Sequence, residues 1–291
     1  MGIIPCNNCQ QLSFAFILQK ESPLGEIFSV VRCHSCGLVQ VNPQPSPQEV
    51  LKYYNDSYFT QRTDRGYDNY YSDELRKEIS RVFRLNLQDL GFFSWETEYR
   101  KQNKELRSLD IGCAAGYFVD FMKQKSYTAE GIEVAEGPVR FARETLGLHI
   151  HQEDFLDWDP SYQQKYDLIT LWATIEHLHK PKETLQKIHK HLNPGGLLIV
   201  STCRYGILAK SKGIDWRYLN VPEHLYYYSM RGLSNQIQEI GFELKKYISY
   251  GSGMTTKKGA GLWFKTKKAI LDRLVKWTNQ GDMMAISAIK P

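Results

Sequence analysis

The sequence predicts an α/β protein in which a small N-terminal β module precedes a doubly wound, mostly parallel sheet. Three observations favour this fold. Short apolar runs alternate with helical patterns from residue 106 onward. The first of these runs leads into a turn that contains two glycines, Gly112 and Gly116. Two Cys-x-x-Cys pairs lie within the first 36 residues, where no comparable alternation is present.

The composition is that of a globular protein with a sizeable core. The 291 residues are 42% apolar and 13% aromatic, enough for one large domain and a smaller one. Lys and Arg exceed Asp and Glu by 37 − 32 = 5, an excess that permits anionic substrates without requiring nucleic acid. No stretch approaches 18 apolar residues, and residues 1–5 resemble no signal peptide. We therefore expect a cytoplasmic protein without a membrane span.

The N-terminal cysteines have the spacing of a zinc ribbon. Two strand-like runs, 12–18 and 27–32, separate the two pairs, and the turn 22–25 joins the runs. Six cysteines in a cytoplasmic chain, four of them paired, favour a metal over disulfides, although four unrelated thiols are the alternative. Four thiolates complete a tetrahedron, so the Zn²⁺ is expected to be structural. The predicted ligands are Cys6, Cys9, Cys33 and Cys36.

The segment 43–100 is expected to link the N-terminal module, residues 1–42, to the main domain, residues 101–291. Three prolines stiffen its start, and Ser46 is placed to cap a short helix that ends near Tyr54. Residues 53–71 are rich in tyrosine and show no clear period. A second helix is predicted from Ser72 to about residue 90, because its apolar residues follow helical spacing.

The main domain shows the alternation of a doubly wound sheet. Pro138 and Pro181 lie where the first turns of two predicted helices begin. The predicted strands are 106–111, 127–133, 148–152, 166–172, 196–202, 242–250 and 283–289, and the predicted helices are 116–124, 137–146, 182–192 and 229–240.

Residues 257–278 interrupt the last two strands with a basic amphipathic helix. Its lysines and arginine surround apolar residues such as Trp263 and Trp277. A membrane-surface or phosphate-binding role is one interpretation. A solvated basic face over a packed apolar stripe is commoner in proteins, and this is what we expect here.

The chemistry of the glycine turn points to a nucleoside with a positively charged tail. The dinucleotide fingerprint G-x-G-x-x-G does not match the spacing Gly112-x3-Gly116, and an acidic residue before the loop, Asp110, would repel phosphates. Asp110 suits an ammonium and a sulfonium instead. Glu133 ends the next strand, 21 positions after Gly112, at the distance expected for a carboxylate that binds ribose hydroxyls.

Five segments occur in the order seen in class I S-adenosylmethionine-dependent methyltransferases, which this chain resembles: Leu109–Gly116, Gly131–Glu133, Gln152–Phe155, Tyr166–Leu171 and Leu192–Ile199. The resemblance implies a Rossmann-like sheet of seven strands whose end is antiparallel. It implies that Asp110 and the loop hold the methionine part of the cofactor, Glu133 the ribose, and Asp154 with Phe155 the adenine. The predicted cofactor residues are Asp110, Gly112, Ala114, Gly116, Tyr117, Glu133, Val134, Asp154, Phe155 and Trp172.

The cofactor site differs from the family at one position of the glycine turn, and tyrosines of the N-terminal extension are candidates to complete it. The family has a glycine where this chain has Ala114. We expect φ < 0 there, which suits alanine, and cofactor binding that is retained but weaker. In the resembled family the N-terminal extension lies over the cofactor, and Tyr58 or Tyr67 is the candidate for that contact, although ordinary packing also explains the tyrosines.

Two Glu-His pairs are expected at the carboxyl edge of the sheet, where ligands of such sheets bind. Glu176-His177 follows the strand that ends at Trp172, and Glu223-His224 lies in a Pro-Glu-His-Leu-Tyr-like loop. Methyl transfer requires a positioned nucleophile and a base that removes its proton. The resemblance, which extends to a subset with a four-cysteine module and sugar-methylating members, favours His224 as the base. His177 and Glu223 support it, and Trp216, Tyr226 or Tyr228 shape the acceptor pocket.

Several alternatives remain open from the sequence. The leading hypothesis is methylation, on oxygen or carbon, of a small molecule, a sugar or nucleotide sugar. A nucleic-acid or protein methyltransferase is the first alternative, although the loop Ala173–His177 lacks the Asn-Pro-Pro-Tyr-like sequence of base-amino methylation. A non-catalytic cofactor-binding scaffold is the second.

His149 and His151 alternate on one strand, but without a third ligand nearby we expect surface residues. The sequence sets no oligomeric state.

Overall fold

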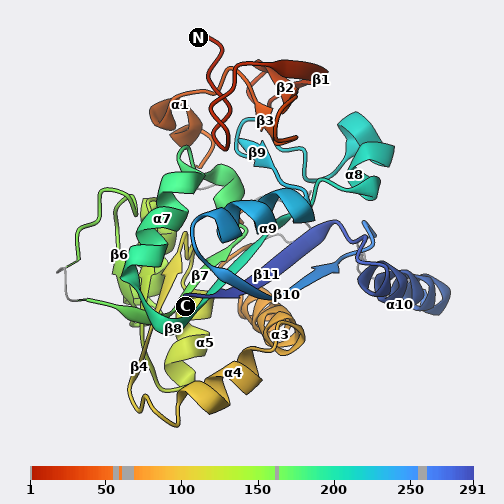
Figure 1. Cartoon of the computed structure of the whole chain (residues 1–291). Helices are drawn as coiled ribbons and strands as arrows, with labels where there is room; N and C mark the ends of the chain where they lie inside the picture. The colour runs from red at the N-terminus through yellow and green to blue at the C-terminus, as the bar shows by residue number, and fades with distance from the viewer. Residues whose placement is uncertain (1, 55–58, 61–68, 161–163, 255–260) are drawn as a thin grey trace.

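The computed structural model describes residues 2–54, 59–60, 69–160, 164–254 and 261–291. These residues form two sheets, a large mixed sheet and a small antiparallel one, as Figure 1 shows. The strand order of the large sheet is β10-β11-β8-β7-β4-β5-β6 and that of the small sheet is β1-β2-β3-β9. The predicted fold class is therefore confirmed, and one strand of the small sheet, at residues 226–227, comes from the main domain.

The large sheet has seven strands within the described residues. Its strands are β4 (Leu106–Ile111), β5 (Tyr127–Ile132), β6 (His149–His151), β7 (Tyr166–Trp172), β8 (Leu192–Cys203), β10 (Glu243–Tyr250) and β11 (Met283–Ile289). The strands from β8 to β6 run parallel, whereas β11 is antiparallel to both β8 and β10. The antiparallel end agrees with the sequence-based expectation.

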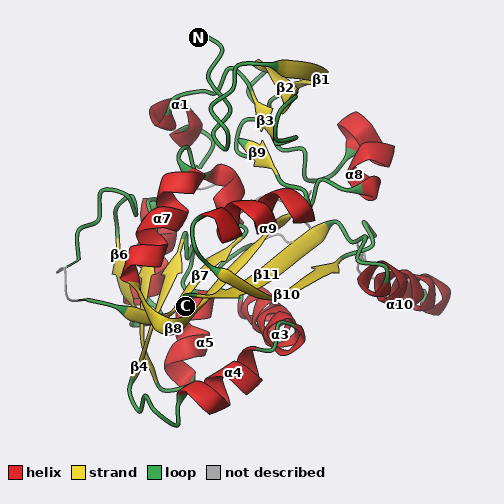
Figure 2. Ribbon diagram, in the orientation of Figure 1, coloured by secondary structure: helices red, strands yellow, loops and turns green. Residues whose placement is uncertain are grey.

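Helices cover both faces of this sheet (Figure 2). On one face, α7 (Pro181–His191) and α9 (Met230–Glu239) bury apolar residues such as Leu185 and Ile237 against it. On the other, α3 (Asp73–Asp89), α4 (Phe92–Tyr99) and α5 (Tyr117–Gln124) contribute a core that includes Leu87 and Phe118. Helix α6 (Glu136–Glu144) packs beside β6. Helix α4 was not predicted from the sequence.

The predicted capping signals are present at the starts of two helices. Helix α1 (Pro47–Leu51) begins with a capping box in which the Ser46 side chain accepts from the Glu49 N–H and the Glu49 carboxylate accepts from Ser46. At α3 the Ser72 hydroxyl accepts a hydrogen bond from the Leu75 N–H. Each cap satisfies N–H groups that have no partner within the first turn.

The small sheet joins the N-terminal module to a distant loop. Its strands are β1 (Phe14–Glu21), β2 (Ile27–Cys33), β3 (Val39–Val41) and β9 (Tyr226–Tyr227). Strand β9 pairs antiparallel with β3, and the Val41 N–H donates to the Leu225 carbonyl over 2.9 Å. Helix α8 (Ile207–Lys212) lies in the same connection after β8. The module at residues 1–42 is thus hydrogen-bonded directly to the residues that follow His224.

Helix α10 (Leu262–Trp277) differs from the expected arrangement. The helix covers residues 262–277 of the predicted 257–278, of which 257–260 lie outside the described residues, and Figure 1 shows it projecting beside β10. None of its residues is buried. Phe264 is half-buried, but Trp263 and Trp277 are exposed to solvent. The expectation of a packed apolar stripe is therefore wrong for most of the apolar residues, because they face away from the sheet.

Candidate functional site

The glycine turn connects β4 to α5 at the carboxyl edge of the sheet. Gly112 has φ 68° and Gly116 has φ 75°, conformations that favour glycine. A Cβ atom at Gly112 would meet Thr174 Cγ2 at 2.4 Å, and one at Gly116 would meet Leu148 Cδ1 at 2.7 Å. Backbone conformation and space therefore both require glycine at these positions.

Ala114 adopts a conformation that the sequence did not predict. Its φ is 46°, in the left-handed region, where we expected a negative value. Its N–H donates to the Glu133 Oε2 over 2.9 Å, and this bond holds the turn in place. The left-handed region costs an L-residue roughly 1–2 kcal/mol. Alanine is thus strained at the position where the resembled family has glycine.

Asp110 lies at the end of β4 with a buried carboxyl group. Its Oδ1 accepts a hydrogen bond from the Thr170 hydroxyl on β7 over 2.6 Å. Burial, opposed by the Thr170 hydroxyl and assisted by the charge of Glu133, raises the pKa of Asp110 to about 8. A buried carboxylate without a cation is unfavourable. An ammonium group at this site would stabilise the ionised form.

Glu133 lies against the glycine turn, as its sequence distance implied. Its two carboxylate oxygens accept hydrogen bonds from the N–H groups of Ala114, Val134 and Ala135 over 2.8–2.9 Å. Burial raises the pKa of Glu133, and the three N–H groups lower it. A carboxylate has about four acceptor positions, so one remains for a ligand hydroxyl after these three bonds.

Aromatic residues of the N-terminal extension cover the turn. Phe59 is buried against Ala135, with Ala114, Tyr70 and Tyr71 packed around it. The ring of Tyr70 also stacks on Tyr117 at 5.5 Å between centroids, and the Tyr117 hydroxyl donates to the Tyr70 carbonyl. The two tyrosines that the sequence offered for contact with the cofactor, Tyr58 and Tyr67, both lie outside the described residues.

The other predicted cofactor residues lie along the same sheet edge in different environments. Val134 is exposed, and Asp154 is exposed with its Oδ1 accepting from the Leu156 N–H. Phe155 is buried and stacks on Trp158. Trp172 packs between the rings of Phe83 and Phe118, on the face covered by α3 and α5.

The two predicted histidines meet beside this edge. The rings of His177 and His224 lie 4.6 Å apart and nearly perpendicular. His177 belongs to the short turn Ile175–His177 after β7, and His224 precedes β9. Glu176 is buried next to them, and one ligand atom from each of the three residues lies within 4.8 Å of the others. The structure therefore brings together both histidines and Glu176.

The hydrogen bonds of His177 set its tautomer. Its Nδ1 lies 2.7 Å from the main-chain carbonyl of Glu223, and a carbonyl oxygen can only accept. Nδ1 therefore carries a hydrogen, which it donates to this carbonyl. The Tyr54 hydroxyl is also 2.7 Å from Nδ1. Glu223 thus contacts His177 through its main-chain carbonyl.

His224 is more enclosed than its partner. Its side chain is 4% exposed, and its Nδ1 lies 3.7 Å from the Cys203 Sγ. The aromatic residues expected to shape the acceptor pocket, Trp216, Tyr226 and Tyr228, are buried around the same connection. They pack within the two core clusters on either side of β9.

Sequence reasoning missed two residues of this cluster. Glu176 was recognised as the neighbour of His177 but not as a member of the site, and Tyr54 was only one tyrosine in a rich segment. Tyr54 contacts His177 and also packs near Phe59, so it links the cover of the glycine turn to the histidines. Nothing in its sequence neighbourhood distinguishes it from Tyr53, which instead donates to Glu26.

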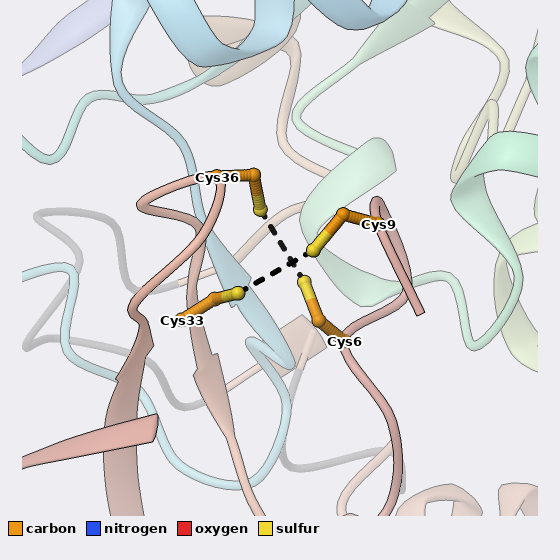
Figure 3. A group of neighbouring side chains, drawn as sticks. All are labelled: Cys6, Cys9, Cys33 and Cys36. Atoms are coloured by element: carbon orange, nitrogen blue, oxygen red, sulfur yellow. Dashed lines mark hydrogen bonds between the residues drawn. The ribbon is translucent and has the colours of Figure 1, made fainter. Parts of the chain in front are cut away.

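The four N-terminal cysteines converge, as Figure 3 shows. The Sγ atoms of Cys6 and Cys36 are 3.5 Å apart, as are those of Cys9 and Cys33, too far for disulfides. Four thiolates around Zn²⁺ at about 2.3 Å would lie about 3.8 Å apart, close to these distances. Gly37, at φ 74°, allows the second knuckle to turn. The donor set and spacing fit a tetrahedral metal.

His149 and His151 have a neighbour that the sequence did not reveal. Glu130 on β5 lies 2.9 Å from His151 Nε2 and 3.8 Å from His149 Nδ1. Its carboxylate also accepts from the Arg107 guanidinium over 2.6 Å and from the Tyr166 hydroxyl over 3.2 Å. The expectation of no third partner is therefore wrong: the two histidines lie beside a buried carboxylate that also forms an ion pair with Arg107.

Comparison with known proteins gives curated relatives at low identity. The chain is 31% identical over 107 residues to a ubiquinone biosynthesis O-methyltransferase of Histophilus somni, covering 34% of this chain and 45% of the relative. It is 25% identical over 134 residues to the enzyme of the same name from Pectobacterium carotovorum, covering 44% and 55%. The chain thus spans about half the length of the curated relatives it matches.

Solved structures share the fold at lower identity. A SAM-dependent methyltransferase from Archaeoglobus fulgidus aligns with a TM-score of 0.55 and 15% identity, covering 81% of this chain and all of that one. The cyclase SpnF aligns with a TM-score of 0.55 and 17% identity, covering 86% and 98%. Since one of these is a cyclase, the fold alone does not define the reaction.

The family model described as a methyltransferase domain matches residues 67–247, more than half of the chain. This range includes the glycine turn, Glu133 and both histidines. The chain therefore belongs to the methyltransferase domain family, with the fold of the class I S-adenosylmethionine-dependent enzymes.

Proposed function

We propose that this protein transfers a methyl group from S-adenosylmethionine to a small molecule, a sugar or nucleotide sugar. The observation that carries the proposal is the pair of histidines, His177 and His224, because the loop of His177 contacts the glycine turn through Thr174. A site that only bound the cofactor would need Asp110 and Glu133, but not a base. The names of the curated relatives, O-methyltransferases of ubiquinone biosynthesis, support a small acceptor.

The residues of the glycine turn fit the cofactor. Asp110 would bind its ammonium group, since the buried carboxyl needs a cation to ionise. Glu133 would accept from the ribose, and Asp154 and Phe155 would border the adenine. When bound, the cofactor supplies a methyl group on a sulfonium, ready for in-line displacement. The aromatic cover around Phe59 would exclude water from this part of the site.

The histidine cluster would hold the acceptor and take its proton. His224 is the proposed base, and His177, with its tautomer set by the Glu223 carbonyl, is the supporting residue. Glu176, buried beside both rings, would stabilise the imidazolium that forms when a proton is taken up. Removing that proton makes the acceptor oxygen, or a carbon next to a carbonyl, nucleophilic.

The four-cysteine cluster is proposed to hold a structural Zn²⁺. Four thiolates leave no position for a substrate or water. The metal would fix the N-terminal sheet, which pairs through β3 with β9 directly after the His224 loop. Protein purified without chelators should contain close to one zinc per chain by elemental analysis, and less than about half an equivalent would contradict the assignment.

A screen of acceptors tests the reaction. The protein is incubated with S-adenosylmethionine and a panel of nucleotide sugars, and products are examined for the mass gain of one methyl group. Pools of RNA, DNA and peptides run in parallel. Methylation of a sugar supports the proposal. Methylation only of nucleic acid or peptide would overturn the small-molecule assignment, and S-adenosylhomocysteine binding without any methylation would favour the scaffold alternative.

A further inference from the structure

Helix α10 presents a row of large apolar side chains to solvent. Trp263 is 75% exposed, Ile270 59%, Leu274 47% and Trp277 84%. Successive members are seven, four and three residues apart. Because each residue turns an α-helix by about 100°, these spacings place all four in one narrow stripe along the helix. We call these four residues the outer stripe.

A different side of α10 holds the helix against the sheet. Phe264, Leu271 and Val275 are half-buried and follow a second helical spacing, and α10 contacts β10. The Asp272 carboxylate accepts from the Ser252 N–H over 3.0 Å, and Lys276 forms an ion pair with Asp89 on α3. The helix is therefore anchored by its inner side while the outer stripe faces outward.

The charges around the outer stripe are strongly basic. Residues 262–277 contain five Lys or Arg and one Asp, a net charge of 5 − 1 = +4. Lys268 pairs with Asp272 and Lys276 with Asp89. In the part of the chain that the structure describes, Lys265, Lys267 and Arg273 form no ion pair. By helical spacing, Arg273 and Lys267 flank the outer stripe on its two sides.

We propose that α10 binds the surface of an anionic lipid bilayer. Tryptophans at both ends of an apolar stripe suit the membrane interface, where the ring is buried and its N–H stays near water. Flanking lysine and arginine side chains reach the phosphate groups while their stems lie along the apolar region. No described helix is long and apolar enough to cross a bilayer, so the helix would lie in the plane of the interface.

The charge and the apolar stripe together favour a bilayer over other occupants. A second copy of this chain would bring another helix of the same +4 charge to the interface, which is electrostatically unfavourable. A nucleic acid would use the charges but leave Ile270 and Leu274 exposed. An anionic bilayer matches both features at once, because it offers negative headgroups above an apolar interior.

Vesicle flotation with the full-length protein tests this proposal without knowledge of the methyl acceptor. Vesicles of phosphatidylcholine with about 30 mol% phosphatidylglycerol are compared with vesicles of phosphatidylcholine alone. We expect binding to the anionic vesicles that is at least ~10-fold stronger and that decreases with added salt. The double variants Trp263→Ser/Trp277→Ser and Lys267→Glu/Arg273→Glu should each lower the partition coefficient by at least ~10-fold.

Matched controls separate this surface from general effects of charge or hydrophobicity. Leu24→Ser removes an exposed apolar side chain from another part of the surface, and Lys101→Glu reverses an exposed charge on the segment after α4. Both should bind vesicles as the unchanged protein does, and circular dichroism should show all variants folded. Equal binding by the α10 variants, no binding to anionic vesicles at low salt, or a dimer that dissociates on Trp263→Ser would each overturn the proposal.

Discussion

The two halves of the candidate site are built in different ways. The cofactor half depends on neighbouring strand ends: β4 supplies Asp110 and the glycine turn, and β5 leads directly into Glu133. The histidine half is assembled from three distant segments, which contribute Tyr54, the turn with His177 and the loop with His224. The sheet alone positions the cofactor half, whereas the histidine half also needs the N-terminal module and its strand pairing with β9.

This difference predicts that the two halves can be damaged separately. Changes in the strand-end half should weaken cofactor binding. Changes in the histidine half, or in the cysteine cluster that supports it, should slow turnover while cofactor binding persists. The following experiments are ordered by the size of the expected effect.

His224→Ala should lower turnover by ~10²–10⁴, the usual contribution of a positioned general base, with cofactor affinity near that of the unchanged protein. His177→Ala should have a smaller effect. Steady-state rates with an identified acceptor, and calorimetry with S-adenosylhomocysteine, measure the two properties. His149→Ala, which changes an exposed histidine elsewhere, is the control. A greater loss with His177→Ala would move the base assignment to His177, and full activity of both variants would remove it.

Cys33→Ser should remove the metal and lower turnover by about 10²-fold, because displacement of a reacting group by about 1 Å is costly. The physical link is the β3–β9 pairing next to His224. Cofactor affinity should change little, since the glycine turn is supported by β4 and β5. Cys113→Ser, at a buried cysteine outside the cluster, controls for loss of a thiol. Unchanged turnover in a zinc-free protein would show that the two halves are independent.

Cofactor affinity should rise with pH by up to ~10-fold per unit between about pH 6 and 8. Burial raises the pKa of Asp110 to about 8, so a cationic ligand must displace a proton below that pH. The free energy of unfolding of the ligand-free protein should instead fall as the pH rises. The fold favours the protonated carboxyl, so its contribution to the free energy of unfolding is present at low pH and lost as the pH approaches 8. Calorimetry and thermal unfolding across this range measure both trends, and Asp110→Asn should abolish them.

Glu133→Ala should weaken S-adenosylhomocysteine binding by at least ~1.5 kcal/mol, slightly more than tenfold. The variant loses the ribose acceptor and also leaves the N–H groups of Ala114, Val134 and Ala135 without their carboxylate. Glu133→Gln keeps the shape but replaces one oxygen with a donor, so it should also bind more weakly. Calorimetry that shows the affinity unchanged in both variants would contradict the ribose assignment.

Ala114→Gly should have the smallest effect, a gain of about 1 kcal/mol or less in the free energy of unfolding. Glycine adopts the φ of 46° at this position without the steric cost that alanine bears. Cofactor affinity should stay the same or rise slightly. Chemical denaturation is the measurement, and Ala115→Gly, at a buried neighbour, is the control that should destabilise the protein. Destabilisation by Ala114→Gly would show that the methyl group contributes packing that outweighs its strain.

Much of the cofactor half could be predicted from the sequence because its parts are linked by short, regular distances. A parallel strand must end where its ligand-binding loop begins, so a strand pattern followed by two glycines placed Asp110 and the turn correctly. The spacing from Gly112 to the end of the next strand likewise placed Glu133 against the turn. The negative φ predicted for Ala114 was wrong, because its N–H is held by Glu133, which follows a different strand.

The sequence by itself determined the sheet, the four-cysteine cluster and the candidate residues, since each depends on local periodicity or short spacing. Only the tertiary structure decided which of those residues meet. It placed Tyr54 and the Glu223 carbonyl beside the same nitrogen of His177, paired β9 with the N-terminal sheet, and turned most of the apolar residues of α10 outward. The physical reason is that contacts between distant segments depend on how whole faces pack together, and no sequence spacing encodes that geometry.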